Sequence, residues 1–291
     1  MHQTEEFQVI TQDQSTICAT LYKGEERGTH LIIVGPAAGA PQYYYSRFSE
    51  YASSYKDFDV VTFDYQGIGK SLDESVIDCQ VKMSDWGEQD LESIINWADS
   101  KYAKIFLIGH SVAGQVFPKA KSNSRISAAY FVGSQTAYHG CWSGLWHFYV
   151  LIFWYLLIPA TTFILDYLPG WTMGGKVPLP KRAALEWRKW GTHRRGVLQN
   201  NDELTRKFEQ VKIPLHFVSI EDDKLLAPSA ATQELMSYYK NAKTSFQFIS
   251  PKNLGLKKIG HFGFFKQQFK KQLWPMPMLY FTQYVKKLDE S

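Results

Sequence analysis

Short apolar runs alternate with amphipathic segments along most of this chain, and this alternation limits the fold more than any other feature. The apolar runs have the length of buried strands and lie at 30–34, 59–63, 104–108, 126–132, 214–220 and 246–250. Helical patterns follow them at 43–55, 84–100, 112–121, 229–239 and 262–273. Residues 7–22 are rich in strand formers and predict an N-terminal β-hairpin. The alternation predicts an α/β fold, with a mostly parallel sheet and helices on both faces.

The sharpest local pattern is residues 107–114, which read Leu-Ile-Gly-His-Ser-Val-Ala-Gly. A buried strand here runs directly into a turn of small residues and then into a helix. In such a turn the serine is held in a strained backbone conformation, and its hydroxyl projects at the carboxyl end of the strand. The pattern predicts Ser111 as a nucleophile, although Ala113 stands where the usual pattern has glycine. The alternative is an ordinary strand-to-helix turn with a capping serine.

A serine hydroxyl needs a general base, and the base needs an acid that orients it. His261 lies in the turn Gly-His-Phe-Gly, after the strand at 246–250. Asp222 and Asp223 follow the strand at 214–220. The order serine, aspartate, histidine is the order used by hydrolases whose serine sits in such a turn. The position in the loop favours Asp223 as the acid, with Asp222 as the alternative.

The loop after the first parallel strand, at 35–39, reads Gly-Pro-Ala-Ala-Gly and contains only small residues. A tetrahedral oxyanion needs two preorganised backbone N–H donors. We expect one from Val112, directly after Ser111, and the other from Ala38, with Ala37 as the next candidate. Small side chains let this backbone approach an oxyanion closely. The alternative is an ordinary tight turn.

Four segments carry a resemblance to a known family: 35–39, Asp-Tyr-Gln-Gly-Ile-Gly-Lys-Ser at 64–71, Gly-His-Ser at 109–111 and Ile-Gly-His-Phe-Gly at 259–263. With these motifs the chain resembles the α/β-hydrolase superfamily over about 25–290, in particular its serine-aminopeptidase and monoglyceride-lipase-like branch. The resemblance implies an α/β-hydrolase fold and hydrolysis of an ester or amide by a serine nucleophile, without a cofactor. Gln66 stands where such proteins usually have arginine, which implies that a supporting ion pair is absent.

About 80 residues separate the strand at 126–132 from the strand at 214–220. Hydrolases of this fold commonly carry a cap over the active site at this point, so we predict a helical, aromatic-rich cap at 137–210. The core is then 1–136 and 211–291. Six of the nine tryptophans lie between Trp142 and Trp190. An apolar cap indicates a lipophilic acyl ester as the substrate.

The apolar stretch 145–165 is long enough to cross a bilayer. A single span there would leave Ser111 and His261 on opposite sides of the membrane. We therefore expect a cap packed on the catalytic face, and the alternative is a cap that also contacts a membrane surface or a partner. The basic, aromatic stretch 181–195 suits anionic lipid head groups, but a solvated amphipathic helix has the same pattern.

Charge, cysteine content and short motifs limit the partners and cofactors that the sequence indicates. The 32 basic and 28 acidic side chains give a net charge of +4, which is too small to indicate nucleic acid. Cys18, Cys79 and Cys141 form no Cys-x-x-Cys pair, so neither a zinc site nor any other metal is predicted. Gly-Lys-Ser at 69–71 lacks the upstream glycine of a phosphate-binding loop. The polar N-terminus has no signal-peptide pattern and predicts a cytoplasmic protein, with a peripheral position at a membrane as the alternative.

The residues thus predict a serine hydrolase that cleaves a small lipophilic carboxylic ester through an acyl-enzyme. Ser111 attacks the carbonyl, His261 acts as base and then acid, and Asp223 holds the imidazole. One alternative is an amidase or aminopeptidase with the same triad. An aminopeptidase usually needs a carboxylate in the cap, and 126–175 contains only Asp166. The other alternative is a binding protein on the same scaffold without catalysis. The sequence does not indicate an oligomeric state.

Overall fold

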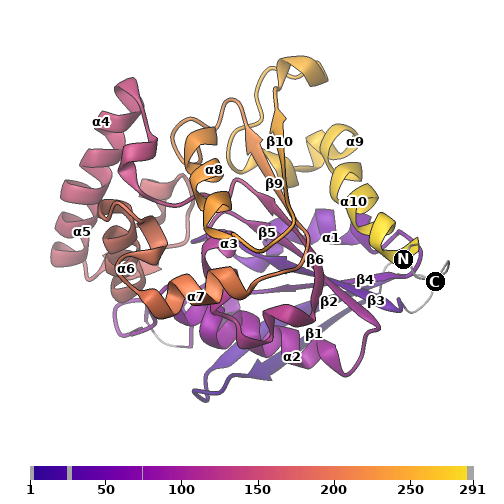
Figure 1. Cartoon of the computed structure of the whole chain (residues 1–291). Coiled ribbons are helices and arrows are strands. Elements are labelled where there is room, and N and C mark those ends of the chain that lie inside the picture. The colour runs from indigo at the N-terminus through magenta and orange to yellow at the C-terminus, as the bar shows by residue number, and fades with distance from the viewer. Residues whose placement is uncertain (1–2, 25–27, 74, 287–291) are drawn as a thin grey trace.

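An eight-stranded sheet forms the centre of the molecule (Figure 1). The structure is a computed structural model and describes residues 3–24, 28–73 and 75–286. The strands are β1 (Gln3–Ile10), β2 (Thr16–Lys23), β3 (His30–Gly35), β4 (Phe58–Phe63), β5 (Lys104–His110), β6 (Ile126–Val132), β9 (Leu215–Ile220) and β10 (Thr244–Ile249). Their order is β1-β2-β4-β3-β5-β6-β9-β10. Only the pairs β1–β2 and β2–β4 are antiparallel, which confirms the predicted hairpin and the mostly parallel sheet.

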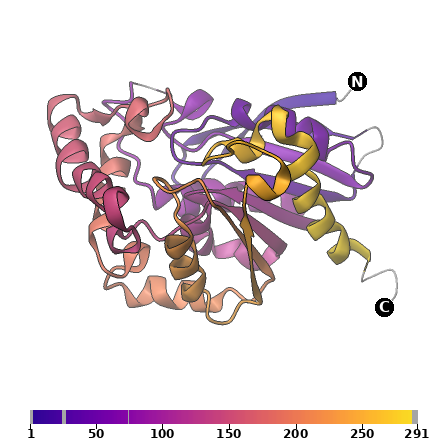
Figure 2. The same ribbon diagram turned by 90° about the horizontal axis from the view of Figure 1, so that it is seen from above.

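Helices cover both faces of the sheet, as predicted (Figure 2). One face packs on α1 (Ser46–Ala52), α9 (Lys270–Leu273) and α10 (Pro275–Lys286), and the other on α2 (Glu92–Asp99), α3 (Ala113–Val116), α7 (Asp202–Gln210) and α8 (Ser229–Tyr238). The alternation of side chains along a strand divides β3 between the two layers. Leu31 and Ile33 join the core under α2, α3, α7 and α8, whereas Ile32 and Val34 join the core under α1, α9 and α10. All four are fully buried, as expected for a parallel strand covered on both faces.

The helices differ from the pattern at three places, and prolines explain two of these differences. The helix predicted at 112–121 shortens to α3 followed by a 3-10 turn, because Pro118 has no N–H to continue the helix. The helix predicted at 262–273 is mostly 3-10 turns, and only α9 remains. The helix α10 was not predicted. It tolerates Pro275 and Pro277 because both lie in its first turn, where N–H groups have no helical partner.

The segment between β6 and β9 is mainly helical. It contains α4 (Gly144–Ile152), α5 (Ile158–Ile164), α6 (Lys181–Thr192) and α7, with a small hairpin of β7 (Tyr167–Leu168) and β8 (Leu179–Pro180) that the sequence did not predict. A π-helical turn, Phe153–Leu157, joins α4 to α5, so 144–164 is one continuous helix at the left edge of Figure 1. Below we call 137–210 the insertion.

Several loops at the carboxyl edge of the sheet touch the insertion. Trp142 Nε1 donates to the carbonyl of Leu225, 2.8 Å away, in the loop after β9. A Cβ added at Gly39, after β3, would lie 3.1 Å from Met173 Cε. A Cβ added at Gly67, after β4, would lie 2.6 Å from Pro180 Cγ. The insertion therefore rests on the edge of the sheet where the predicted site residues lie.

Candidate active site

Ser111 lies between β5 and α3 with φ of +56°, a left-handed conformation that costs a residue with a Cβ about 1–2 kcal/mol. Its N–H donates to the carbonyl of Val132, the last residue of β6, at 2.9 Å. A Cβ added at Gly109 would lie 3.0 Å from Ala113 Cβ, and one added at Gly35 would lie 3.1 Å from it. The methyl group of Ala113 fits because both neighbours lack side chains. This explains how the turn forms without the usual glycine.

His261 and Asp223 are directly hydrogen bonded. His261 Nδ1 lies 2.6 Å from Asp223 Oδ2, and both side chains are buried. The other carboxylate oxygen of Asp223 accepts the N–H of Ala227 at 3.1 Å. Asp222 instead accepts the backbone N–H groups of Ile259 and Gly260, at 2.9 and 3.0 Å. Asp223 thus contacts the imidazole, and Asp222 holds the loop that carries it.

Ser111 and His261 both lie beside the end of β6. A Cβ added at Gly133, directly after Val132, would lie 3.2 Å from His261 Cε1 and Nδ1. Within the described residues Ser111 Oγ makes no hydrogen bond, so the serine is not yet linked to the imidazole. In enzymes without bound substrate, catalytic hydrogen bonds are often long and tighten in the complex.

A chain of hydrogen bonds runs beneath the site, from the loop after β3 to the loop of His261. The Ala37 N–H donates to Tyr45 Oη at 2.9 Å, and Tyr45 Oη lies 2.8 Å from His110 Nδ1. His110 Nε2 lies 3.1 Å from the carbonyl of His261. That carbonyl can only accept, so Nε2 carries the proton and Nδ1 accepts from Tyr45. Complete burial, together with the nearby His261, holds the pKa of His110 well below its usual range. His110 is therefore neutral.

The hydrogen bonds of Tyr45 determine which backbone N–H groups can donate to an oxyanion. The N–H of Ala37 is already bound to Tyr45, whereas in the described residues the N–H groups of Ala38 and Val112 donate no hydrogen bond. In the parallel pair β3–β5, Gly35 is the register partner of Gly109. Ala38 and Val112 each come three residues after this pair, on neighbouring strands. Of the two candidates in the loop, Ala38 has the available donor.

Residues that the sequence did not single out complete this region. Tyr45 binds a histidine 65 positions later, and no local pattern indicates such a contact. Tyr44, its neighbour, donates from its hydroxyl to the carbonyl of Phe262. Gly133 leaves room for the imidazole, and its only sequence signal is its position directly after a predicted strand.

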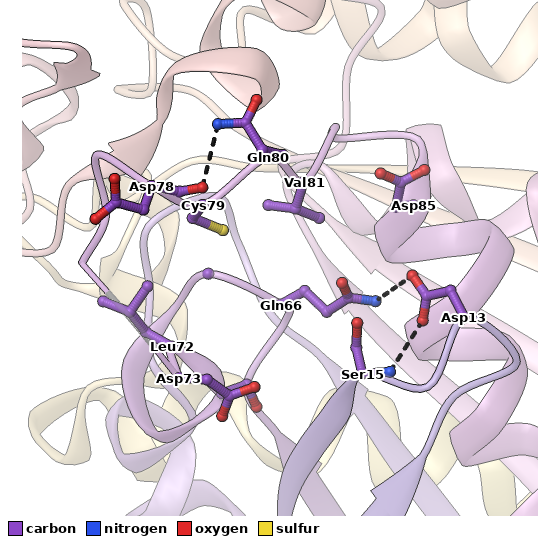
Figure 3. Close-up of a pocket in the computed structure, with 12 residues that line it drawn as sticks. Asp13, Ser15, Gln66, Leu72, Asp73, Asp78, Cys79, Gln80, Val81 and Asp85 are labelled. Atoms are coloured by element: carbon purple, nitrogen blue, oxygen red, sulfur yellow. Dashed lines mark hydrogen bonds between the residues drawn. The ribbon is translucent and has the colours of Figure 1, made fainter.

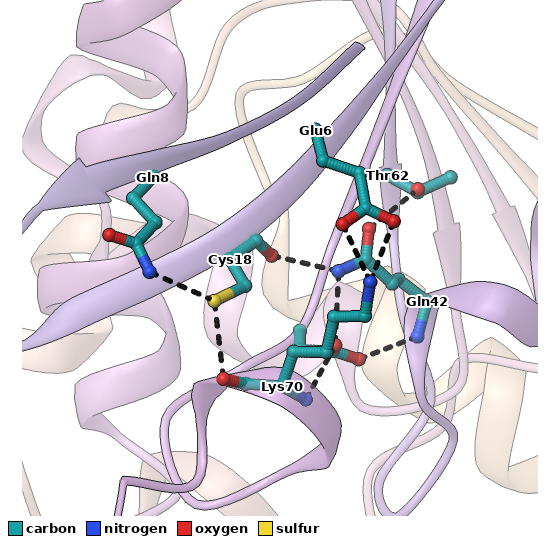
Figure 4. Close-up of polar contacts among 7 residues, drawn as sticks. Glu6, Gln8, Cys18, Gln42, Thr62 and Lys70 are labelled. Atoms are coloured by element: carbon teal, nitrogen blue, oxygen red, sulfur yellow. Dashed lines mark hydrogen bonds and ion pairs between the residues drawn. The ribbon is translucent and has the colours of Figure 1, made fainter. Parts of the chain in front are cut away.

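The loop after β4, 64–71, is held by polar contacts within the protein (Figure 4). Asp64 accepts from the backbone N–H of Gln42 at 2.6 Å, from its side chain at 3.0 Å, and from the Lys70 N–H at 3.0 Å. The Lys70 ammonium pairs with Glu6 at 2.6 Å. Ser71 Oγ donates to the carbonyl of Asp64 at 2.8 Å. Because Gln42 follows the loop after β3, these contacts anchor the far end of that loop.

Gln66 replaces the arginine expected from the resemblance. Its N–H and its Nε2 each donate to the carboxylate of Asp90 at 2.8 Å, and Asp90 is completely buried. Figure 3 shows Gln66 beside Asp13, on the wall of a polar pocket of about 440 Å³. Burial raises the pKa of Asp90 well above its usual range.

A second pocket, of about 200 Å³, is apolar and lies between the insertion and the core. Its walls include Trp142, Val150 and Trp187 from the insertion, and Leu225 and Leu226 from the loop that carries Asp223. The pocket thus adjoins the loop that carries Asp223. In the described part of the chain, no group of three or more His, Cys, Asp or Glu side chains is arranged to hold a metal ion.

The profile of the alpha/beta hydrolase family matches residues 31–265. The chain belongs to this family, and its sheet with helices on both faces is the α/β-hydrolase fold predicted from the motifs. No curated protein matches the sequence.

Solved structures with the same architecture are distant in sequence. DcsB, solved in complex with its substrate analogue, has a TM-score of 0.63 and 16% identity, covering 98% of this chain and 99% of its own. The Pyrococcus furiosus esterase Pf2001 has a TM-score of 0.59 and 13% identity, covering 98% and 93%. Est1E from Butyrivibrio proteoclasticus, with ferulic acid bound, has a TM-score of 0.59 and 13% identity, covering 96% and 99%. At these identities the similarity shows a common fold alone.

Proposed function

We propose that this protein is a serine hydrolase that cleaves carboxylic esters with a lipophilic acyl group. The observation that carries the proposal is the buried His261–Asp223 hydrogen bond beside a serine held at positive φ. Ser111 Oγ attacks the ester carbonyl carbon and gives its proton to His261 Nε2, while Asp223 holds the Nδ1–H. His261 then protonates the leaving alcohol. Water releases the acid from the acyl-serine by the same two steps.

The tetrahedral intermediate carries a negative oxygen between β3 and β5. The N–H groups of Ala38 and Val112 hold this oxygen, since neither donates to another atom of the described chain. The N–H of Ala37 plays a supporting part through Tyr45.

The substrate class follows from the apolar pocket. Its aromatic walls adjoin the loop of Asp223 and suit an acyl chain better than a charged group. One of the structural neighbours, Pf2001, is named an esterase, which supports ester over amide cleavage. The insertion acts as the cap, at 137–210. A cytoplasmic location is supported by Cys18 and Cys141, which form no disulfide.

A fluorophosphonate probe tests the serine chemistry, because it modifies activated serines covalently. We expect the wild type to be labelled and Ser111→Ala to be unlabelled. Ser134→Ala is the matched control, since Ser134 is a buried serine whose hydroxyl has no partner in the described residues. It should be labelled like the wild type. Labelling of Ser111→Ala, or none of the wild type, contradicts the proposal.

The lipophilic substrate is tested with p-nitrophenyl esters of increasing chain length. We expect kcat/KM to rise from acetate to octanoate. Val150→Phe narrows the pocket and should lower the octanoate-to-acetate ratio about tenfold, the effect of leaving two CH2 groups unburied. A wild type that hydrolyses only acetate esters contradicts the lipophilic substrate but leaves the serine chemistry in place.

A further inference from the structure

The continuous helix of α4 and α5 exposes a row of large apolar side chains on its outer side. We call this row the apolar face; it consists of Leu145, Phe148, Tyr149, Ile152, Tyr155, Leu156, Phe163 and Ile164. Spacings of three, four and seven residues put these side chains on one side of a helix. Phe163 is 85% exposed and Leu156 63%. Contiguous apolar surface of this kind on a soluble domain marks an interaction site.

Charge favours an anionic lipid surface as the partner. The apolar face carries no charged residue, and the next acid along the chain, Asp166, is paired with Lys181 at 2.5 Å. The guanidinium of Arg188 lies over the Tyr155 ring, 5.9 Å from its centre. The insertion has nine basic and five acidic residues, a net charge of +4 that equals the charge of the whole chain. All of the excess positive charge therefore lies in the segment that presents the apolar face.

Topology determines how this helix can meet a bilayer. By length and composition the helix could cross a membrane. Only 22% of its most apolar window is buried in the protein, so it is not a core helix. The strand before it, β6, pairs with the strand after it, β9. Both ends of the helix therefore return to one sheet on one side of any membrane. The helix can lie in the interface, with its apolar side among the lipid chains and cations toward the head groups.

The apolar face also reaches the apolar pocket. Tyr149 and Ile152 belong to the face and line the pocket, whose opposite wall is Leu225 and Leu226 beside Asp223. We propose that the apolar face docks on a bilayer that contains anionic lipids, so that the pocket opens at the membrane surface. The docking is inferred from the apolar face and the charge of the insertion, and it does not depend on the proposed function. The delivery of a lipophilic ester from the bilayer to Ser111 rests on the proposed function.

Vesicle flotation tests the docking. The full chain is mixed with phosphatidylcholine vesicles with and without phosphatidylserine, and the bound fraction is measured. We expect binding that strengthens with phosphatidylserine and weakens with salt. The double variant Leu156→Asp, Phe163→Asp should bind at least tenfold more weakly, because two deeply inserted side chains become charged. Leu279→Asp is the matched control: it changes a leucine of similar exposure on α10 and should bind like the wild type.

Activity measurements separate a failure of docking from a failure of the proposed enzyme function. The double variant should keep the wild-type rate on a water-soluble p-nitrophenyl butyrate, and Ser111→Ala should still float with the vesicles. Loss of both activities in the double variant would indicate misfolding, which circular dichroism and melting temperature check. The proposal fails if the wild type does not bind vesicles, or if the double variant binds as well as the wild type. A concentration-dependent dimer abolished by the double variant, without vesicle binding, would assign the face to a second copy. Retention after alkaline carbonate extraction would indicate a span.

Discussion

Gly133 is a single residue on which the position of the imidazole depends. It has φ of +60°, and a Cβ at this position would lie 3.2 Å from His261 and 3.6 Å from Asp223 Oδ2. Any other residue at this position would strain the backbone and would also displace His261. These two effects can be separated, because Gly255 has φ of +69° and nothing within 4 Å of an added Cβ.

We predict that Gly133→Ala and Gly255→Ala each lower the free energy of unfolding by about 1 kcal/mol, since both place a Cβ at positive φ. Only Gly133→Ala should lower kcat/KM for a soluble ester, by about tenfold or more, because a 1 Å shift of a catalytic group has large effects. Urea unfolding and steady-state kinetics measure the two quantities. Equal activity of the two variants would contradict the packing of Gly133 against His261.

At the scale of elements, the hydrogen bonds of Tyr45 and His110 join two loops that no strand connects. One loop supplies Ala38, and the other supplies His261. Tyr45 lies just before α1 and is completely buried, and its burial raises the pKa of its hydroxyl well above the ordinary value. The hydroxyl therefore stays protonated and donates to His110 while it accepts from Ala37.

Tyr45→Phe should leave two buried groups without a partner, the N–H of Ala37 and Nδ1 of His110. We expect a loss of about 1–3 kcal/mol in the free energy of unfolding. We also expect a lower kcat with little change in KM, because the oxyanion donors and not the acyl pocket lose their support. Tyr55→Phe is the control, since it removes a part-buried hydroxyl that pairs with Tyr51 away from the site. The same loss of kcat in both variants would contradict this reasoning.

At the scale of the whole molecule, pH acts through carboxyl groups that are buried in the fold. Burial raises the pKa of Asp90 well above its usual range and also raises that of Asp64. A carboxyl group with a raised pKa in the folded state contributes most stability below its unfolded pKa of about 3.9. That contribution is lost as pH rises toward the folded value. Asp90 therefore destabilises the protein increasingly above pH 4.

Asp90→Asn removes this titration, and a flipped Gln66 amide can still exchange hydrogen bonds with the asparagine. We predict that the stability of Asp90→Asn relative to the wild type increases as pH is raised from 4 to 8. Urea unfolding at several pH values measures it. A difference that is constant with pH would show that Asp90 does not titrate abnormally. The comparison between the two proteins cancels the opposite effect of His110, whose lowered pKa destabilises the fold in acid.

The sequence was sufficient for the sheet, because buried parallel strands leave long apolar runs. It also led to the prediction of Ser111 and His261 as site residues, because each lies in a short motif at the end of a strand. It favoured Asp223 over Asp222 only by position in the loop, since the direction in which each side chain points depends on the folded structure. Tyr45 and the hairpin β7–β8 were missed because tertiary contacts determine them. The helix α10 was missed because its prolines argue against a helix unless its start is known.

The neighbouring positions of β6 and β9 have a consequence for how this fold can diversify. Paired strands lie about 4.8 Å apart, so the insertion leaves and rejoins the sheet at almost the same point. The entropy of closing such an excursion grows only with the logarithm of its length. Helices can therefore be added to the insertion, removed from it or exchanged as one unit without altering the spacing of Ser111, Asp223 and His261. A change of substrate and a change of membrane preference can both arise by replacing a single exchangeable module.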